Sequence, residues 1–204
     1  IADPRVLLLD EPAQGLDALL RTELYSLLRQ VRQEFETPTL LVTHDLEECF
    51  ELGEEMLVLR EGKLVQTGPP RSVLERPATI EVARLLGQFN LLPVEILALD
   101  PGRNTSRLRF ADFEITGPYL KGHFRGDRVW ICARPSELTV RARDGKPAAN
   151  QVPARLERVV EMPHGMRLEF DRELTVELSH AEYERQRHNR EWVIELRPDT
   201  IRVL

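Results

Sequence analysis

The stretch Val6-Leu7-Leu8-Leu9-Asp10-Glu11-Pro12 organises the fold predicted for this 204-residue chain. Four consecutive apolar residues followed by two carboxylates predict a strand over residues 6–10 that is buried on both faces and ends at the carboxyl edge of a parallel sheet. Open α/β sheets bind their ligands at that edge. An acid there can hold Mg²⁺ through water, and a second acid beside it can orient or deprotonate a water molecule. Taken alone, the acidic triplet is more simply explained as a buried strand that runs into a turn.

The residues that follow complete a β-α-β unit. Apolar residues recur at i+3/i+4 spacing and predict a helix over 17–35, for which Asp17 is a good N-cap. A second buried strand is predicted over 39–42, parallel to the first because a right-handed crossover joins them. His44 follows at its tip, where a neutral imidazole can bind a phosphate oxygen. The sequence therefore predicts that His44 lies beside the two carboxylates.

These segments resemble three motifs of the ATP-binding cassette (ABC) ATPases. The resemblance is carried by Asp10-Glu11-Pro12, Gly15-Leu16-Asp17 and Leu41-Val42-Thr43-His44-Asp45, which are similar to the Walker B motif, the D-loop and the H-loop. It implies that Asp10 is the Mg²⁺ acid, Glu11 the catalytic base, Asp17 the D-loop acid and His44 the γ-phosphate sensor. Mg²⁺ would be held by Asp10 through water, and ATP with Mg²⁺ would be the cofactor set. The D-loop reads Gln-Gly-Leu-Asp where the family often has Ser-Ala-Leu-Asp, which predicts a more flexible loop.

Other motifs of that family do not occur in the sequence. No G-x-x-x-x-G-K-[ST] is present, so the backbone cradle and the Lys that bind β- and γ-phosphates are missing. The Q-loop and the LSGGQ signature are missing as well. We therefore expect the chain to be the second half of an ABC importer ATPase, and to be inactive by itself.

Composition is that of an ordinary globular protein. The chain is 42% hydrophobic and 30% charged, and it contains no run of 18 apolar residues. Its two cysteines, Cys49 and Cys132, are far apart in the sequence, which argues against a metal site and fits a reducing cytosol. A net charge of -6 gives no general footprint for nucleic acid.

The character of the sequence changes after residue 86. Before it, residues 56–68 predict a hairpin and two short helices follow; after it, short alternating apolar runs separated by Gly, Pro, Asn and Asp turns predict a small antiparallel barrel. We therefore predict an α/β domain over 1–86, as part of a P-loop NTPase with an ABC-type parallel sheet, and an all-β domain over 87–204. The second domain resembles the TOBE domain, an OB-like barrel appended to importer ATPases.

Two residues of the second domain are candidates for ligand binding. In Ala133-Arg134-Pro135-Ser136-Glu137-Leu138, which is similar to the Val-Arg-Pro-Glu-Asp-Ile of TOBE domains, Arg134 and Glu137 are interpreted either as contacts for an anion or a regulatory partner, or as structural residues of a strand turn. The structural interpretation is simpler. The stretch from His180 to Arg190 is basic, but its interleaved glutamates favour a solvated helix over a nucleic-acid site. Met162-Pro163-His164-Gly165-Met166 is better explained as a hairpin turn than as a metal site.

The resemblance implies a motor subunit that hydrolyses ATP to drive import. It implies a homodimer of ATPase subunits, permease subunits as transmembrane partners, a substrate-binding protein acting indirectly, and a cytoplasmic location, peripheral on the inner face of the cell membrane. No nucleic-acid partner is expected. Segments such as LLGQFNLL and ARPSELTV look most like the sulfate/molybdate group, with sulfate or thiosulfate ahead of molybdate and with sugar or polyamine import as alternatives. The rival hypothesis is a stand-alone regulatory or oxyanion-binding TOBE module without catalysis.

Overall fold

The computed structural model describes residues 5–35, 37–143, 147–189 and 191–204. The chain divides into two compact units between Arg76 and Pro77. The predicted domain boundary, after residue 86, lies C-terminal to this division. Helix α4 (Ile80–Leu86), which the prediction placed in the first domain, belongs to the second unit. The segment 143–150, whose composition predicts a loop between two sets of strands, and the predicted helical stretch 180–190 each include residues outside the described ranges. Within the described part of the chain, no helix is both long and apolar enough to cross a membrane.

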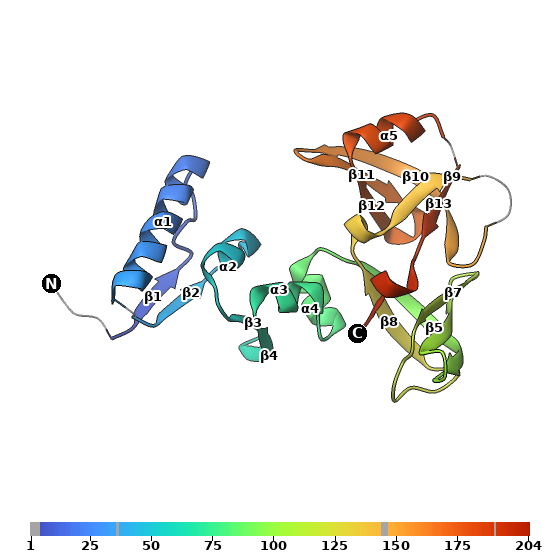
Figure 1. The fold of residues 1–204 in the computed structure, drawn as a ribbon, viewed down its shortest axis with the longest axis horizontal. Helices are drawn as coiled ribbons and strands as arrows, with labels where there is room; N and C mark the ends of the chain where they lie inside the picture. The colour runs from blue at the N-terminus through green and yellow to red at the C-terminus, as the bar shows by residue number, and fades with distance from the viewer. Residues whose placement is uncertain (1–4, 36, 144–146, 190) are drawn as a thin grey trace. The chain divides into compact units, whose positions relative to one another are not determined.

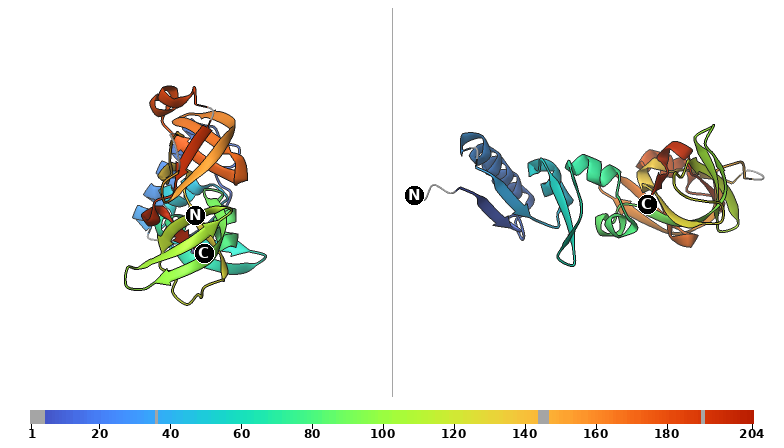
Figure 2. Two further views of the ribbon diagram at one scale, coloured as in Figure 1. Left: turned by 90° about the vertical axis from the view of Figure 1, so that its right-hand side faces the viewer. Right: turned by 90° about the horizontal axis from the view of Figure 1, so that it is seen from below.

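The first unit contains the predicted β-α-β arrangement, with α1 lying alongside the β1–β2 pair (Figures 1 and 2). Strand β1 pairs in parallel with β2, and Leu7 is aligned with Thr39 and Asp10 with Val42. Asp17 caps α1, since its Oδ1 accepts a hydrogen bond from the Leu20 amide at 2.9 Å. The elements of this unit are β1 (Leu7–Asp10), α1 (Ala18–Phe35), β2 (Thr39–Val42), α2 (Leu46–Leu52), β3 (Met56–Arg60), β4 (Lys63–Gly68) and α3 (Pro70–Glu75).

Strand β1 is not buried on both faces, so that prediction is wrong for this structure. Leu8 is 70% exposed and its register partner Leu40 is 50% exposed, whereas Leu7 and Leu9 on the opposite face are half-buried. The physical reason is that the described parallel sheet has only two strands, and helix α1 covers one of its faces. The wider ABC-type sheet is therefore not seen in the described residues.

The described strands of the second unit form two five-stranded antiparallel sheets. Their orders are β14-β8-β5-β6-β7 and β12-β11-β10-β13-β9, and buried side chains from both sheets form one hydrophobic core that includes Trp192 and Ile131. The strands are β5 (Asn90–Asp100), β6 (Thr105–Phe110), β7 (Phe113–Pro118), β8 (Arg128–Ala133), β9 (Thr139–Ala142), β10 (Gln151–Met162), β11 (Gly165–Phe170), β12 (Leu174–Leu178), β13 (Glu191–Glu195) and β14 (Arg202–Val203). The predicted antiparallel strands are confirmed, but they form two sheets where a single barrel was expected.

The two sheets repeat one another in topology. Each contains a three-strand meander, a fourth strand that pairs with the first strand of the meander, and a short fifth strand contributed by the other half of the unit. Strand β9 leaves the first half through a short 3₁₀ turn, η1 (Pro135–Glu137), and pairs with β13, whereas β14 leaves the second half through η3 (Pro198–Thr200) and pairs with β8. The two halves are therefore interlocked by an exchange of edge strands.

Two buried asparagines occupy equivalent places in the repeat and join the halves. Asn90, at the start of β5, exchanges hydrogen bonds with the backbone of Thr175 at 2.7 and 2.8 Å. Asn150, just before β10, bonds the Thr116 amide and carbonyl at 2.8 and 2.7 Å and also donates to the Leu196 carbonyl at 2.6 Å. Each side chain thus satisfies backbone groups of the opposite half, which a buried polar residue requires.

Helices α4 and α5 (His180–Gln186) of this unit have ordinary capping residues. Thr79 caps α4 through the Val82 amide, and Gly87 ends it in the left-handed conformation with φ of 65°. Helix α5 lies between β12 and β13 in the sequence and begins with a capping box formed by Ser179 and Glu182. All its described residues are at least partly exposed, which confirms the prediction of a solvated helix for this part of the stretch.

Candidate active site

The parallel pairing of β1 and β2 brings Glu11 and His44 together. Because Asp10 is aligned with Val42, the residues that follow each strand emerge at the same edge of the sheet. The Glu11 amide continues the ladder by donating to the Val42 carbonyl at 2.8 Å. The first side chains beyond the ladder are therefore the ones that meet.

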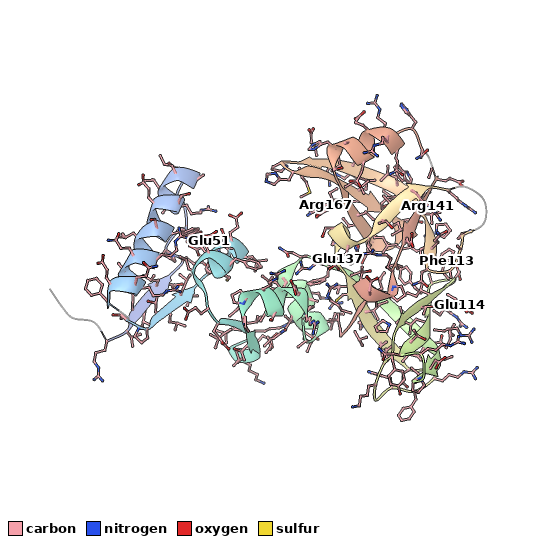
Figure 3. All side chains as sticks on the ribbon, viewed as in Figure 1. Glu51, Phe113, Glu114, Glu137, Arg141 and Arg167 are labelled. Atoms are coloured by element: carbon pink, nitrogen blue, oxygen red, sulfur yellow. The ribbon has the colours of Figure 1, made fainter. Side chains whose placement is uncertain are left out.

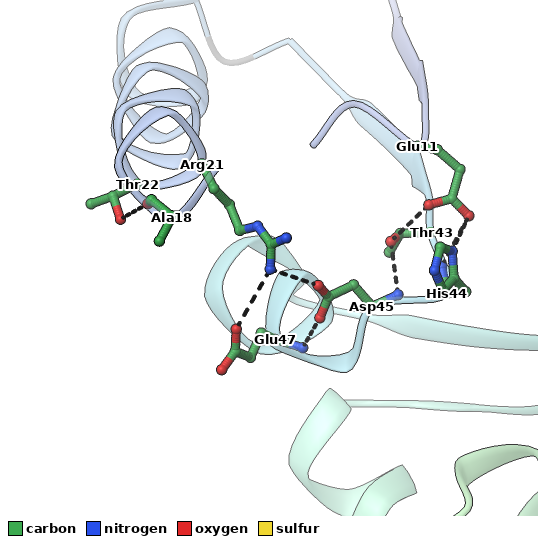
Figure 4. A network of polar contacts seen from close by, with 8 residues as sticks. All are labelled: Glu11, Ala18, Arg21, Thr22, Thr43, His44, Asp45 and Glu47. Carbon is green, nitrogen blue, oxygen red and sulfur yellow. Dashed lines mark hydrogen bonds and ion pairs between the residues drawn. The ribbon is translucent and has the colours of Figure 1, made fainter. Parts of the chain in front are cut away.

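The Glu11 carboxylate is held by three groups from the β2–α2 turn (Figure 4). Its Oε1 lies 2.8 Å from Nδ1 of His44 and accepts the His44 backbone amide at 3.1 Å. Its Oε2 accepts the hydroxyl of Thr43 at 3.4 Å. The predicted neighbours, Glu11 and His44, are thus in direct contact in the folded chain.

Glu11 also has an unusual backbone conformation. Its φ is 45°, in the left-handed region that a non-glycine residue occupies at a cost of about 1–2 kcal/mol. Strain of this kind persists where the surrounding structure fixes it, and it is concentrated at functional sites. Here the hydrogen bonds from both the backbone and the side chain of Glu11 to the β2 end hold the residue in place. The strained turn aims the carboxylate across the strand tips toward His44.

The contact with Glu11 also alters the acidity of His44. A hydrogen bond to the Glu11 carboxylate, together with its negative charge, raises the pKa of His44 above the ordinary value, and Asp45 and Glu48 contribute in the same direction. The His44 side chain is 77% exposed, and Nε2 of its ring has no hydrogen-bond partner among the described residues. The ring is therefore fixed through one nitrogen and leaves the other for a ligand.

The remaining predicted acids of the first unit are at the same end of the sheet but outside this cluster. Asp10 is an exposed residue at the last position of β1, and Asp17 is an exposed helix cap. No group of three or more His, Cys, Asp or Glu side chains suited to a metal ion is found within the described ranges. Mg²⁺ is commonly bound by one or two carboxylates with water and substrate phosphates as its other ligands, so the single exposed carboxylate of Asp10 fits that minimal donor set.

The β2–α2 turn is also held by residues to which the sequence patterns assigned no role. Arg21 of α1 pairs with Asp45 at 3.2 Å, and Asp45 caps α2 through the Glu47 amide at 2.8 Å. Beneath them the Tyr25 hydroxyl and the Glu48 side chain are buried, and burial, with the nearby carboxylates, raises the pKa of Tyr25 to about 12. Asp45 and Glu48 have the spacing of a capping box, but only the aspartate caps the helix, whereas the glutamate is buried.

Arg134 and Glu137 lie in the second unit, at the η1 turn (Figure 3 marks Glu137). The Arg134 guanidinium stacks over Phe89 at 5.7 Å, and the Glu137 amide donates to the Arg134 carbonyl. Glu137 forms a two-pronged ion pair with Arg202 at 2.6 and 2.7 Å, and this partner lowers the pKa of the Glu137 carboxyl. The ion pair joins the two exchanged segments, because Arg202 lies on β14.

Curated proteins similar to this chain share one activity class. An Fe(3+) ions import ATP-binding protein from Rhizobium etli is 29% identical over 74% of the chain, and a sulfate/thiosulfate import ATP-binding protein from Acinetobacter baylyi is 36% identical over 74%. A spermidine/putrescine import ATP-binding protein from Aliivibrio fischeri is 30% identical over 87%. The chain spans 42%, 40% and 51% of these three relatives, respectively. Homologues of this chain are therefore ATP-binding subunits of import systems.

The cargoes named for these relatives differ, being iron, sulfate or thiosulfate, and polyamines, so the class is shared and the cargo is not. No protein-family model matches the chain. Among solved structures, the cytoplasmic molybdate-binding protein ModG is 7% identical, with a TM-score of 0.48 over 56% of this chain and 94% of ModG.

Proposed function

We propose that this chain is part of the ATP-hydrolysing motor of an ABC importer, with Glu11 as the catalytic base and His44 as the phosphate sensor. The observation that carries the proposal is the contact between the Glu11 carboxylate and His44 at the tips of two parallel strands. The similarity to import ATP-binding proteins over about three quarters of the chain supports it independently.

The geometry suits the two residues to these roles. Glu11 Oε2 accepts one hydrogen bond in the described structure, from Thr43, so a lone pair of this oxygen remains to accept the proton of a water that attacks the γ-phosphate. The Glu11 charge favours a protonated His44, in which Nδ1–H donates to Glu11 and Nε2–H donates to a phosphate oxygen. The Glu11 carboxylate would therefore orient the water and also favour the protonated form of His44, which donates to the phosphate.

Asp10 and Asp17 have supporting roles in this proposal. Asp10 would hold Mg²⁺ through water, and the ion, when bound, supplies charge neutralisation on the phosphates. Asp17 belongs to the D-loop that would couple two sites. The sequence lacks the phosphate-binding loop and the LSGGQ signature, so we propose that the chain alone is inactive. ATP binding is assigned to a longer protein that contains this chain.

The assembly and cargo follow from the same class. We assign a homodimer of ATPase subunits that drives transmembrane permease partners, receives cargo through a substrate-binding protein, and lies in the cytoplasm on the inner face of the membrane. Sulfate or thiosulfate is the first choice of cargo and molybdate the second, with polyamine or sugar as alternatives; the sulfate/thiosulfate relative supports the first choice and the spermidine/putrescine relative supports a polyamine.

The second unit is assigned to the TOBE class, the OB-like domain appended to importer ATPases. Residues 1–86 would then be nucleotide-binding and residues 87–204 accessory. The alternative, a stand-alone regulatory or oxyanion-binding module, would use Arg134 and Glu137 to bind a ligand. The ion pair of Glu137 with Arg202 favours a structural role for that residue.

The substitution Glu11→Gln in the longer, ATP-binding protein tests the proposal. The amide keeps the shape of the side chain but accepts no proton from water, so we expect hydrolysis to fall by about 100-fold or more while ATP remains bound. Steady-state ATPase assays and a nucleotide-binding titration measure the two effects. Glu23→Gln, which removes an exposed charge from α1, is the control and should leave both unchanged. Hydrolysis retained within about tenfold would show that Glu11 is not the base.

A further inference from the structure

Thr43 is the second side chain in contact with Glu11, after His44. Its hydroxyl oxygen accepts the Asp45 amide at 2.9 Å and lies 3.4 Å from Glu11 Oε2. An ionised carboxylate only accepts hydrogen bonds, and the Thr43 oxygen already accepts one from Asp45. The hydroxyl proton is therefore directed to Glu11, which fixes the direction of the bond.

This bond completes a hold on both oxygens of the carboxylate. His44 binds Oε1 through its amide and its ring, whereas Thr43 is the contact of Oε2. The terminal torsion of a glutamate is broad and nearly two-fold, so contacts to one oxygen leave the group free to turn. A donor on the second oxygen sets the plane of the carboxylate and thus the direction of its lone pairs.

The donor is itself anchored to two helices (Figure 4). The amide that fixes the Thr43 hydroxyl belongs to Asp45, whose carboxylate caps α2 and pairs with Arg21 on α1. Helix α2 is further held to α1 by the ion pair between Arg29 and Glu51 at 2.6 Å. The chain of contacts from Arg21 through Asp45 and Thr43 to Glu11 has donors and acceptors in a consistent order.

We propose that Thr43 is a positioning residue, which orients the Glu11 carboxylate by donating to its Oε2. This inference rests on the proposed function, because it assigns Thr43 to the reaction in which Glu11 is the base. Thr43 touches neither the phosphate nor the water in this role, and it acts through the direction of the Glu11 lone pairs.

The first test uses the 204-residue chain and needs no catalysis. Thr43→Val keeps the shape and removes the hydroxyl, Thr43→Ser keeps the hydroxyl, and Thr22→Val removes a hydroxyl that bonds the Ala18 carbonyl on α1. Hydrogen exchange of the His44 amide, followed by NMR and normalised to the Leu28 amide of α1, reports the hold on the carboxylate. We expect exchange about fivefold faster in Thr43→Val, and within twofold of the parent in the other two.

The second test is the ATPase activity of the longer protein that carries this chain. A misdirected base slows the chemical step without weakening ATP binding, so Thr43→Val should lower kcat about tenfold with KM unchanged, and Thr43→Ser should restore it. If Thr43→Val disturbed the structure as a whole, KM would rise and the Leu28 amide would also exchange faster. Thr43→Ala, which also lacks the hydroxyl, would then be tested in place of Thr43→Val.

The outcomes separate the inference from the proposed function. If Glu11→Gln abolishes hydrolysis while Thr43→Val leaves kcat unchanged, the inference is wrong and the function stands. If Glu11→Gln remains active, the function is wrong, and His44 exchange still decides whether Thr43 holds the carboxylate. Unchanged His44 exchange in Thr43→Val overturns the inference in either case.

Discussion

At the scale of single residues, several unusual features of the first unit meet at Glu11. Glu11 has a left-handed backbone, contacts an exposed histidine and accepts hydrogen bonds on both oxygens. The left-handed backbone costs stability and the histidine is exposed, whereas the hydrogen bonds to the carboxylate hold this arrangement in place. In the proposed function this arrangement orients the base before its substrate binds.

The Glu11–His44 contact predicts a pH dependence. Glu11→Gln should bring the pKa of His44 down toward its ordinary value, because the hydrogen bond to a charged carboxylate is the first cause of the increase. NMR titration of the His44 ring in the 204-residue chain measures the change. Glu23→Gln is the matched control, since Glu23 is an exposed residue of α1 that is not among the causes of the shift. Equal His44 titration in parent and Glu11→Gln would contradict the prediction.

The sign of the stability effect follows from the direction of that shift. A histidine whose pKa is higher in the folded than in the unfolded chain stabilises the fold fully below the unfolded value of about 6.5. The contribution is lost as the pH rises through the raised folded pKa. The Glu11–His44 pair should therefore stabilise the first unit at mildly acidic pH, and this pH dependence should be weaker in Glu11→Gln.

At the scale of elements, the second unit depends on an exchange between two similar halves. The 3₁₀ turns η1 and η3 carry each short edge strand into the opposite sheet, and the two asparagines close the junctions. The repeat can be seen in the sequence once the fold is known. Arg134-Pro135 corresponds to Arg197-Pro198, and Asn90 and Asn150 each stand three residues before a proline. Such short matches were too sparse to reveal the repeat without the sheet order.

Asn150 should be a large contributor to the stability of this unit. Asn150→Ala removes the hydrogen-bond partner of one backbone amide and two carbonyls at a site that is 8% exposed. We therefore expect the free energy of unfolding of this unit to fall by about 3 kcal/mol. Asn104→Ala is the control, because Asn104 has a similar φ, 54° against 62°, but an exposed side chain. Urea unfolding followed by tryptophan fluorescence reports on this unit alone, since both tryptophans, Trp130 and Trp192, lie in it. Equal losses in the two variants would show that strain, not the hydrogen bonds, sets the cost.

At the scale of the whole chain, the two units differ in how much apolar surface they bury. The large hydrophobic core belongs to the second unit. The first unit leaves many large apolar side chains exposed, which are Val6, Leu8, Leu19, Leu20, Leu27, Phe35, Leu40, Val42, Phe50, Leu57, Leu59 and Leu64. Since burial of apolar surface is the main driving force of folding, the first unit should be the less stable one.

Hydrogen exchange along the 204-residue chain tests this difference. Amides of residues 7–9 in β1 should exchange much faster than those of residues 129–133 in β8, because among the described strands β1 has one neighbour and β8 has two. Mass spectrometry on a monomeric sample measures both segments in one experiment. A second copy that covers the exposed apolar residues would protect β1, so the monomer is checked by sedimentation. Equal, high protection of both strands in a monomer would contradict the prediction.

The sequence by itself determined much of the local structure and the contact between Glu11 and His44. The caps at Asp17 and Thr79, the glycine that ends α4 and the hairpin at residues 56–68 depend on neighbours a few positions away, so their signals are contained in short stretches. The contact between Glu11 and His44 was also predictable, because a β-α-β unit brings the tips of its two strands to one edge.

Only the tertiary structure decided the features that depend on residues far apart in the chain. The exposure of Leu8, the pairing of Glu137 with Arg202, and the division of the antiparallel strands into two exchanged sheets each follow from which element lies next to which. The contact between Thr43 and Glu11 is of the same kind, because no pattern in the sequence indicates which carboxylate a threonine hydroxyl will contact. Such contacts are selected by the geometry of the complete fold, which short-range patterns do not contain.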